Sequence, residues 1–245
     1  MLRRSRVQQE PKRGVSSFHA WWAGIDVREY VVEASAVLEV VVAPAASRLY
    51  FWALQTTFTD AAGHEYGGAH VGLQWNPSHA GSTAVNWGGY GVVRDVTSIL
   101  AGSHSLIPST VDDVNTRDFP WVARVPYRFI VYRKSEGWAA DVMDVATRSR
   151  THIRTLHAGG DRLTKMVVWS EVFASCVDPS AVVRWSGLSA RTADGRVLHP
   201  SSVTLSFPTD GACLNNDTRA DAHGLLQVTN TERTGRDGQV VHLPA

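Results

Sequence analysis

The feature that most constrains the fold is an alternation of apolar and other residues with a period of two. In residues 30–42, YVVEASAVLEVVV, alternate positions are aliphatic, and the intervening positions include Glu33, Ser35 and Glu39. Successive side chains of a strand point to opposite faces, so this pattern predicts a strand with one buried face. No segment has a convincing helical period with capping residues, and only residues 98–106 are predicted to form a helical turn.

Segments of the same kind recur along the chain between turns rich in Gly, Pro, Asn and Asp. They contain many of the β-branched and aromatic residues that strands favour. The predicted strands are 30–42, 48–58, 69–75, 122–133, 138–145, 151–156, 163–173, 181–185, 197–207 and 225–229, with a further one within 235–244. Ten or more strands without alternating helices predict an all-β fold, either a sandwich or a barrel.

Length and composition favour one domain without a membrane segment. A chain of 245 residues that is 44% hydrophobic fits a single β domain, which we place at residues 15–230. Residues 1–14 are predicted to be a disordered basic arm, and residues 231–245 a C-terminal strand or tail. The arm lacks the apolar run of an export signal, so we expect a cytoplasmic protein. The net charge of +1 argues against nucleic acid or a membrane surface as partner.

The two cysteines exclude some chemistry. Cys176 and Cys213 do not form a CxxC motif, which argues against a zinc knuckle or thioredoxin-like redox site. Because a disulfide between them would require an oxidising compartment, we expect two buried thiols.

Several segments resemble known jelly-roll domains. The stretch YRFIVYRKSEGWAADVMDVATRSRTHIRTL, followed by GDRLTKMVVWSEVFA, is similar to the strand order of concanavalin-like domains of the lectin and glucanase type. GGAHVGLQW is similar to a strand of an uncharacterised bacterial jelly-roll family. The resemblance covers residues 48–186 and implies two stacked antiparallel sheets with a concave face. It does not imply one function, since such folds serve as lectins, glycosidases, lyases and scaffolds.

Catalysis on a polysaccharide is an alternative function. Glycoside hydrolysis needs two nearby carboxyl groups, and this chain lacks the E-x-D-x-E strand motif of laminarinase-like enzymes. The candidates are Glu171 as acid/base and Asp141 as its partner. Lyase chemistry would use residues such as His70, Gln74, Tyr127 and Arg128, but the lyase patterns R-x-E-x-R and Q-x-H are missing.

No resident cofactor is expected, although the sequence offers two candidate metal sites. Asp113, Asn115 and Asp118 supply hard oxygen atoms at short spacing, which Ca²⁺ prefers. The histidines at 64, 70 and 79 cluster in the sequence, but their spacing fits no known metal site.

Residues 70–91, HVGLQWNPSHAGSTAVNWGGYG, carry the main functional hypothesis. Trp52, Trp138, Trp169 and Trp185 lie in apolar runs and are assigned to the core. Trp75, Trp87 and Trp121 instead adjoin Gly or Pro turns, where rings can stack on sugars and amides can bind hydroxyl groups. We therefore expect non-catalytic binding of a carbohydrate or similar polar ligand on the concave face. The predicted site consists of Gln74, Trp75, Asn76, Asn86, Trp87 and Tyr90. A protein-interaction or oligomeric module, with the basic arm as contact segment, is a third possibility.

Overall fold

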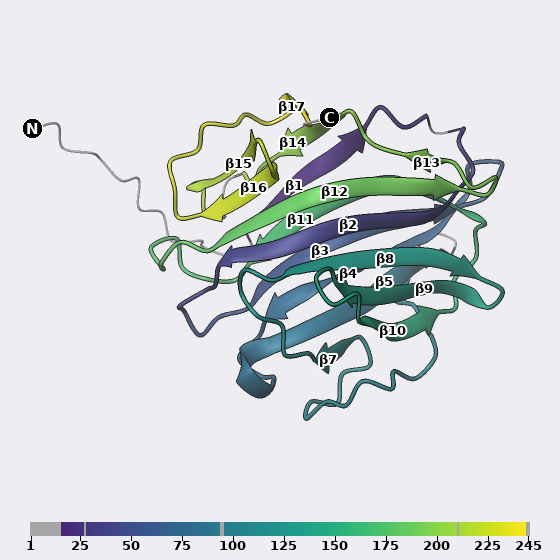
Figure 1. Ribbon diagram of the computed structural model, residues 1–245, viewed down its shortest axis with the longest axis horizontal. Helices are drawn as coiled ribbons and strands as arrows, with labels where there is room; N and C mark the ends of the chain where they lie inside the picture. Colours follow the sequence, from purple (N-terminus) through teal and green to yellow (C-terminus); the bar gives the residue numbers. More distant parts are fainter. Residues whose placement is uncertain (1–15, 27, 94–95, 210, 244–245) are drawn as a thin grey trace, which may run out of the picture.

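The protein is a sandwich of two antiparallel β-sheets. The computed structural model describes residues 16–26, 28–93, 96–209 and 211–243, so the predicted arm at 1–14 lies outside the described residues. Within these ranges, sheet A has nine strands and sheet B has eight (Figure 1). The predicted fold class is therefore confirmed.

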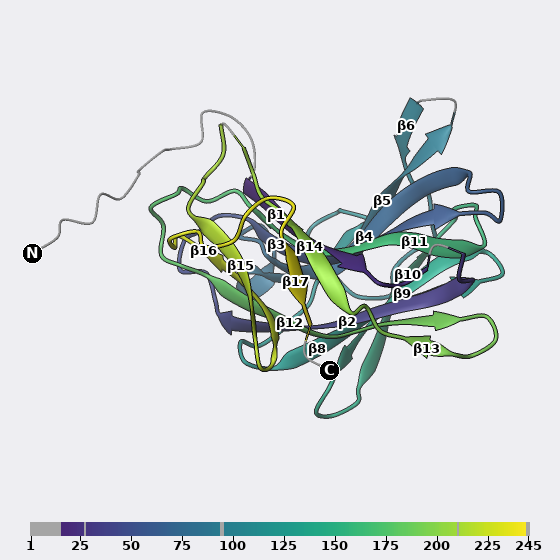
Figure 2. The same cartoon turned by 90° about the horizontal axis from the view of Figure 1, so that it is seen from above.

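In sheet A, strands from both ends of the sequence lie beside strands from its middle. Its order is β17 (Val240–His242), β14 (Ser202–Ser206), β1 (Ser16–Ala23), β11 (Arg162–Val172), β3 (Tyr50–Thr59), β4 (Glu65–Trp75), β5 (Thr83–Val93) and β6 (Val96–Ile99), and β7 (Thr116–Asp118) also pairs with β5. Strand β17 provides the strand that was predicted near the C-terminus. Figure 2 shows the β5–β6 hairpin rising from sheet A on the side away from sheet B.

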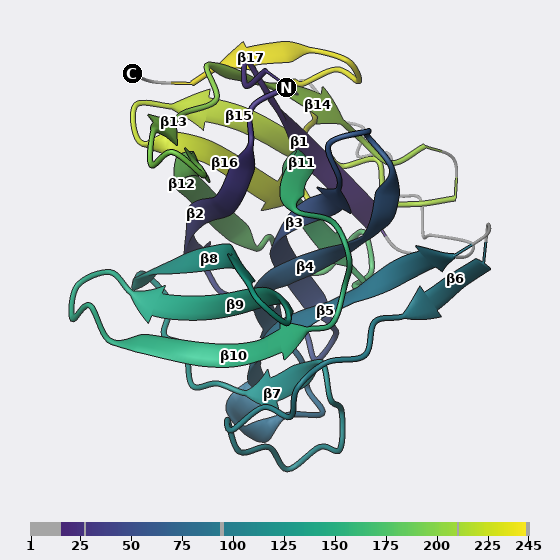
Figure 3. The same ribbon diagram turned by 90° about the vertical axis from the view of Figure 1, so that its right-hand side faces the viewer.

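Sheet B forms the second layer. Its order is β10 (Arg150–Leu156), β9 (Gly137–Asp144), β8 (Pro126–Lys134), β2 (Val31–Val42), β12 (Val182–Thr192), β16 (Gly224–Thr229) and β15 (Asn216–Asp221), with β13 (Val197–Leu198) beside β12. Figure 3 shows the two layers side by side, with β8, β9 and β10 to the left of β3, β4 and β5. No helix among the described residues is long and apolar enough to cross a membrane.

The main core fills the space between the sheets, as strand alternation predicts. In β2, the side chains of Ala34, Ala36 and Leu38 are fully buried in it, whereas Glu33 lies on the other face and forms an ion pair with Arg191. Four tryptophans in this core are almost fully enclosed, namely Trp52, Trp87, Trp138 and Trp185. Each buried aromatic side chain contributes about 1.5–3 kcal/mol through removal of apolar surface from water.

Two local predictions are wrong. Residues 98–106 contain no helical turn, because Ser98 and Ile99 belong to β6 and Gly102 forms a β-bridge with Leu156. The only helical turn in the described chain is the 3₁₀ segment η1 (Ala80–Ser82). Trp169 is buried, but it belongs to a small cluster separate from the main core.

The cysteines form a disulfide, in contrast to the expected thiols. Cys176 and Cys213 are 37 residues apart and join the loop after β11 to the loop before β15. The Cys213 N–H also donates to Oγ of Ser16 in β1 at 2.8 Å. Together, the disulfide and this hydrogen bond link the two sheets at one end. Whether the two cysteines come close enough to bond could not be inferred from the sequence, because it depends on which loops the two sheets bring together.

Candidate functional site

The outer face of sheet A carries a cluster of aromatic and polar side chains that we call the outer patch. It comes from alternate positions of four strands, whose intervening residues point into the main core. The outer patch consists of His19 and Trp21 of β1, Phe51, Ala53 and Gln55 of β3, His70 and Gln74 of β4, and Val167, Trp169 and Glu171 of β11.

Strand register determines which of these residues are neighbours. Glu171 lies directly opposite Phe51 on one side and Ser17 on the other. Phe51 in turn lies opposite Gln74, so Glu171 and Gln74 flank the Phe51 ring in one row across the sheet. Directly opposite residues in antiparallel strands have Cβ atoms about 4.5–5.5 Å apart, so neighbours in this row are within side-chain reach.

The aromatic rings of the outer patch contact one another. The ring centroids of Phe51 and Trp169 are 4.9 Å apart, and those of Phe51 and His70 are 5.4 Å apart, both in edge-to-face arrangements. The His70 ring is 5.7 Å from Trp169. These contacts remove water from the polar groups between the rings, which disfavours their charged forms.

Glu171 is a carboxyl group without a partner among the residues that the structure describes. Its side chain is half-buried and forms no hydrogen bond or ion pair with any of the residues that the structure describes. Burial raises its pKa above the usual value for glutamate. By contrast, Glu65 on the same sheet pairs with Lys165, and Asp118 lies beside His79.

The histidines of the outer patch are neutral at pH 7. Burial lowers the pKa of His70 to about 4, and burial also lowers the pKa of His19. The two nitrogens of His19 each lie 3.3 Å from a serine hydroxyl, that of Ser17 and that of Ser206. No cation from these histidines therefore stands near Glu171 at neutral pH.

Two amide side chains have fixed orientations. Gln55 accepts the indole N–H of Trp169 at 3.1 Å through its side-chain oxygen. Gln74 likewise accepts a hydrogen bond from Nδ2 of Asn76 at 2.9 Å. In both cases the oxygen is occupied, and the amide nitrogen is bonded to no described residue, so it is available as a donor.

A surface depression begins where β11 ends. The hydrogen bond from the Phe173 N–H to the Leu49 carbonyl, at 2.9 Å, extends the β3–β11 ladder beyond Glu171. Phe173 and Arg48 line this depression of about 520 Å³ together with Asp178. The depression is large enough to take part of a substrate, and it lies next to the row that contains Glu171.

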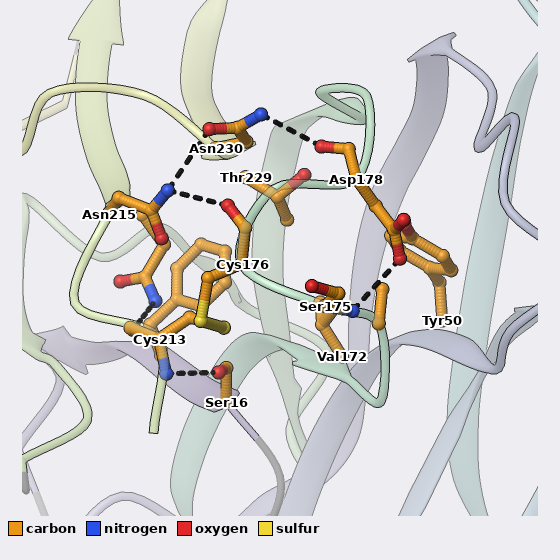
Figure 4. Close-up of a pocket in the computed structure, with 13 residues that line it drawn as sticks. Ser16, Tyr50, Val172, Ser175, Cys176, Asp178, Cys213, Asn215, Thr229 and Asn230 are labelled. Atoms are coloured by element: carbon orange, nitrogen blue, oxygen red, sulfur yellow. Dashed lines mark hydrogen bonds between the residues drawn. A yellow bond between two sulfur atoms is a disulfide. The ribbon is translucent and has the colours of Figure 1, made fainter. Parts of the chain in front are cut away.

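A second hollow lies beside the disulfide and is too small for a substrate. Its volume is about 20 Å³, which is room for roughly one water molecule. Figure 4 shows the side chains of Asn215 and Asn230 bonded to each other beside Cys176. These contacts indicate a structural role.

The residues predicted to bind a sugar do not share one face. Trp87 is fully buried in the main core, so its ring cannot stack on a ligand. Asn86 is also buried, and its Nδ2 donates to Thr116 Oγ1 at 2.9 Å. The half-buried Trp75 packs against the main core and donates its indole N–H to the Ala46 carbonyl at 3.1 Å. Tyr90 alone of the three predicted rings is exposed.

The proposed pair of Glu171 and Asp141 does not form. Asp141 belongs to β9 of sheet B, where its carboxylate pairs with Arg150 and lies 2.7 Å from Nδ1 of His152. Its neighbours Ala140 and Val142 point into the main core, so Asp141 faces outward from sheet B. The two carboxyl groups are therefore on opposite outer faces of the sandwich. The lyase set is divided as well, because Tyr127 and Arg128 belong to β8 of sheet B.

The oxygen atoms predicted as calcium ligands have other partners. Asp113 accepts the N–H of Asn115 at 2.8 Å, and the Asn115 side-chain oxygen accepts from Arg154 at 3.3 Å. Asp118 accepts from Thr110 and lies 2.6 Å from Nδ1 of His79. In the part of the chain that the structure describes, no group of three or more His, Cys, Asp or Glu is placed to hold a metal ion.

Among the comparisons with known proteins, only the comparison with solved structures found matches. No protein-family model matches the chain, and no curated protein matches it. A solved structure of Scytalido-glutamic peptidase with a peptide-based transition state analogue aligns with 90% of this chain and 99% of its own, at 9% identity and a TM-score of 0.46. SCP-B, a member of the eqolisin family of peptidases solved with the tripeptide Ala-Ile-His, aligns over the same shares at 10% identity and a TM-score of 0.46.

The predicted non-catalytic carbohydrate-binding function is wrong. Three of the similar structures are titled as peptidases. The decisive observation in this chain is the burial of Trp87 and Asn86 and the packing of Trp75 against the main core, which leave Tyr90 as the single exposed ring of the predicted site. Sequence reasoning missed Phe51, Gln55 and His19. The sequence pattern that could have indicated them is an aromatic or polar residue at every second position of a strand, on the face opposite the core residues.

Proposed function

We propose that the protein is a hydrolase that cleaves an amide or ester bond in an extended substrate lying across the outer patch. The observation that carries this proposal is Glu171, a half-buried carboxyl group with a raised pKa and no partner among the described residues. A carboxyl group of this kind is suited to proton transfer, because its pKa is moved toward the working pH and no ion pair holds its charge.

The row Glu171–Phe51–Gln74 supplies the groups that such a reaction needs. Ionised Glu171 takes a proton from a water molecule as that water attacks the substrate carbonyl carbon. The carbonyl lies over the Phe51 ring, and the free amide nitrogen of Gln74 donates to the oxygen as it becomes negative. Protonated Glu171 then gives the proton to the leaving group, so one carboxyl group serves both steps.

Glycoside cleavage fits this face less well, because it needs a second carboxyl group within about 10 Å. The other carboxylate in this row is Asp118, which lies four strands from Glu171 through β3, β4 and β5. At about 4.8 Å per strand the separation is roughly 19 Å. From the resemblance of GGAHVGLQW, we also propose that the chain shares its ancestry with an uncharacterised bacterial jelly-roll family.

The surface next to Glu171 favours a chain-like substrate. The depression at Arg48 and Phe173 lies beside this row, past the end of β11, and offers an apolar ring and an exposed cation. At the other end of the outer patch, Gln55 and His70 lie opposite each other on β3 and β4. A substrate that spans both ends places one of its bonds near Glu171.

Purified protein should be tested with internally quenched peptides, p-nitrophenyl esters and labelled oligosaccharides. We expect cleavage of a peptide or ester, with kcat/KM at least about 100-fold lower in Glu171→Gln. The matched control is Glu65→Gln, which changes an exposed carboxylate of the same sheet. Unchanged activity in Glu171→Gln, or cleavage of oligosaccharides alone, would show the proposal to be wrong.

A further inference from the structure

Two buried arginines lie at the edge of the sandwich where β7 and β10 approach each other (Figures 1 and 3). Arg154 of β10 is 2% exposed, and Arg117 of β7 is 7% exposed. The side chain of Arg117 forms no hydrogen bond or ion pair with any described residue. Buried charges are normally paired, so an unpaired buried guanidinium needs an explanation.

Arg154 is bonded only to neutral acceptors. Its Nη1 donates to the Val114 carbonyl at 2.7 Å and to the side-chain oxygen of Asn115 at 3.3 Å, while its Nε has no partner among the residues described. Burial lowers the pKa of Arg154, and the charge of Arg117 lowers it further. Asp113, which is half-buried, acts in the opposite direction but forms no ion pair with either arginine.

The same edge has a surplus of hydrogen-bond donors. Arg117 lies opposite Val85, whose side chain is in the main core, so Arg117 is on the inner side of sheet A. Trp87, two residues further along β5, is on that side as well and has a buried indole N–H without an acceptor. The Nε atoms of Arg117 and Arg154 and the indole of Trp87 are thus three buried donors without partners in the described chain.

We infer that Arg117 and Arg154 form a binding site for a small oxyanion, such as phosphate, sulfate or a carboxylate. A guanidinium group presents paired N–H donors that match two oxygens of such an anion. The anion supplies both the negative charge and the acceptors that this edge lacks. The site is separate from the outer patch, because β7 is four strands from β11 and Arg117 lies on the inner side of the sheet.

The test measures thermal unfolding of the full chain at constant ionic strength, with phosphate, sulfate or acetate replacing chloride. We expect one of these anions to raise the melting temperature in a saturable manner. At ten times its dissociation constant the rise should be about 3–6 °C for a domain of this size. Isothermal titration calorimetry with the same anion should show one site per chain.

Two variants separate this site from general salt effects, which are neither saturable nor local. Arg117→Met should weaken the affinity at least tenfold, whereas Arg219→Met, which changes an exposed arginine of β15, should leave it unchanged. Cleavage by the outer patch should be the same in both variants. The inference is overturned if wild-type protein responds equally to all anions, or if Arg117→Met keeps the saturable response.

Discussion

Glu171 and Phe51 lie directly opposite each other on β11 and β3, on the outer side of sheet A. The two side chains are therefore neighbours, and burial is the cause of the raised pKa of Glu171. Truncation of the ring in Phe51→Ala admits water and should lower that pKa toward the usual glutamate value. NMR titration of the Glu171 side-chain carboxyl carbon measures the change. Tyr90→Ala, on the same sheet but away from Glu171, should not alter it.

Glu171→Gln should make the folded state more stable at pH 7. Because the pKa of Glu171 is higher in the folded chain than in the unfolded chain, ionisation favours unfolding as the pH rises through that interval. Below the unfolded value both states are protonated, so the advantage of the glutamine variant should vanish near pH 3. Urea unfolding at pH 3 and pH 7 checks this. An equal gain at both pH values would contradict burial as the cause.

His70 should make the protein less stable in acid. Burial lowers its pKa from 6.5 to about 4, so the unfolded chain takes up a proton at a pH where the folded chain does not. Stability is therefore lost as the pH falls from 6.5 to 4, by at most about 3 kcal/mol. In His70→Gln the difference in unfolding free energy between pH 7 and pH 4.5 should shrink. The exposed His223→Gln is the matched control and should behave as wild type.

Trp87 should act as a core residue. Trp87→Ala removes a fully buried ring and should cost about 3–5 kcal/mol of unfolding free energy through lost burial and a cavity. Tyr90→Ala removes a ring that is 39% exposed on the same strand and should cost about 1 kcal/mol or less. Chemical denaturation of both variants gives the comparison. Similar small losses in the two would show that the indole is not enclosed.

The disulfide should contribute measurably to stability. Cys176 and Cys213 close a loop of 37 residues, for which the chain-entropy estimate is about 4 kcal/mol. The double variant Cys176→Ser/Cys213→Ser should lose about 2–4 kcal/mol in urea unfolding. Reduction of the wild type should lower its stability to the same extent without affecting the double variant. The predicted cytoplasmic location stays a prediction, and the redox state of these cysteines in protein isolated from cells would test it.

Much of the fold was predictable because strand alternation is a local property. The pattern of residues 30–42 placed Val32, Ala34, Ala36, Leu38, Val40 and Val42 on one buried face. The structure buries the middle four in the main core, whereas Val42 is exposed and Val31 is buried in place of Val32. Turn residues marked most strand boundaries in the same way. Strand β1 was missed because it follows directly on the basic segment, β5 because the glycines at 88, 89 and 91 indicated a turn, and β15 because Asn216–Asp221 contains few apolar residues.

The candidate site was less predictable because it depends on pairing between distant segments. The hydrogen bond from Trp169 to Gln55 spans 114 residues, and the strand that supplies His19 is still further from β11. Alternation shows that a strand has two faces, but it does not show which face meets the other sheet when both carry aromatic rings. Trp169 was assigned to the core for that reason, whereas Trp87 was assigned to a binding face because Gly88 and Gly89 indicated a turn. The structure reverses both assignments.

The sequence by itself thus determined the all-β class and most of the longer strands, although not β1 or β5. Only the tertiary structure decided the sheet order, the disulfide, the separation of Glu171 from Asp141 and the meeting of Arg117 with Arg154. The physical reason is how far apart along the chain the interacting residues lie. Side-chain alternation follows from the geometry of adjacent residues, whereas register and sheet packing follow from contacts between residues that are far apart along the chain.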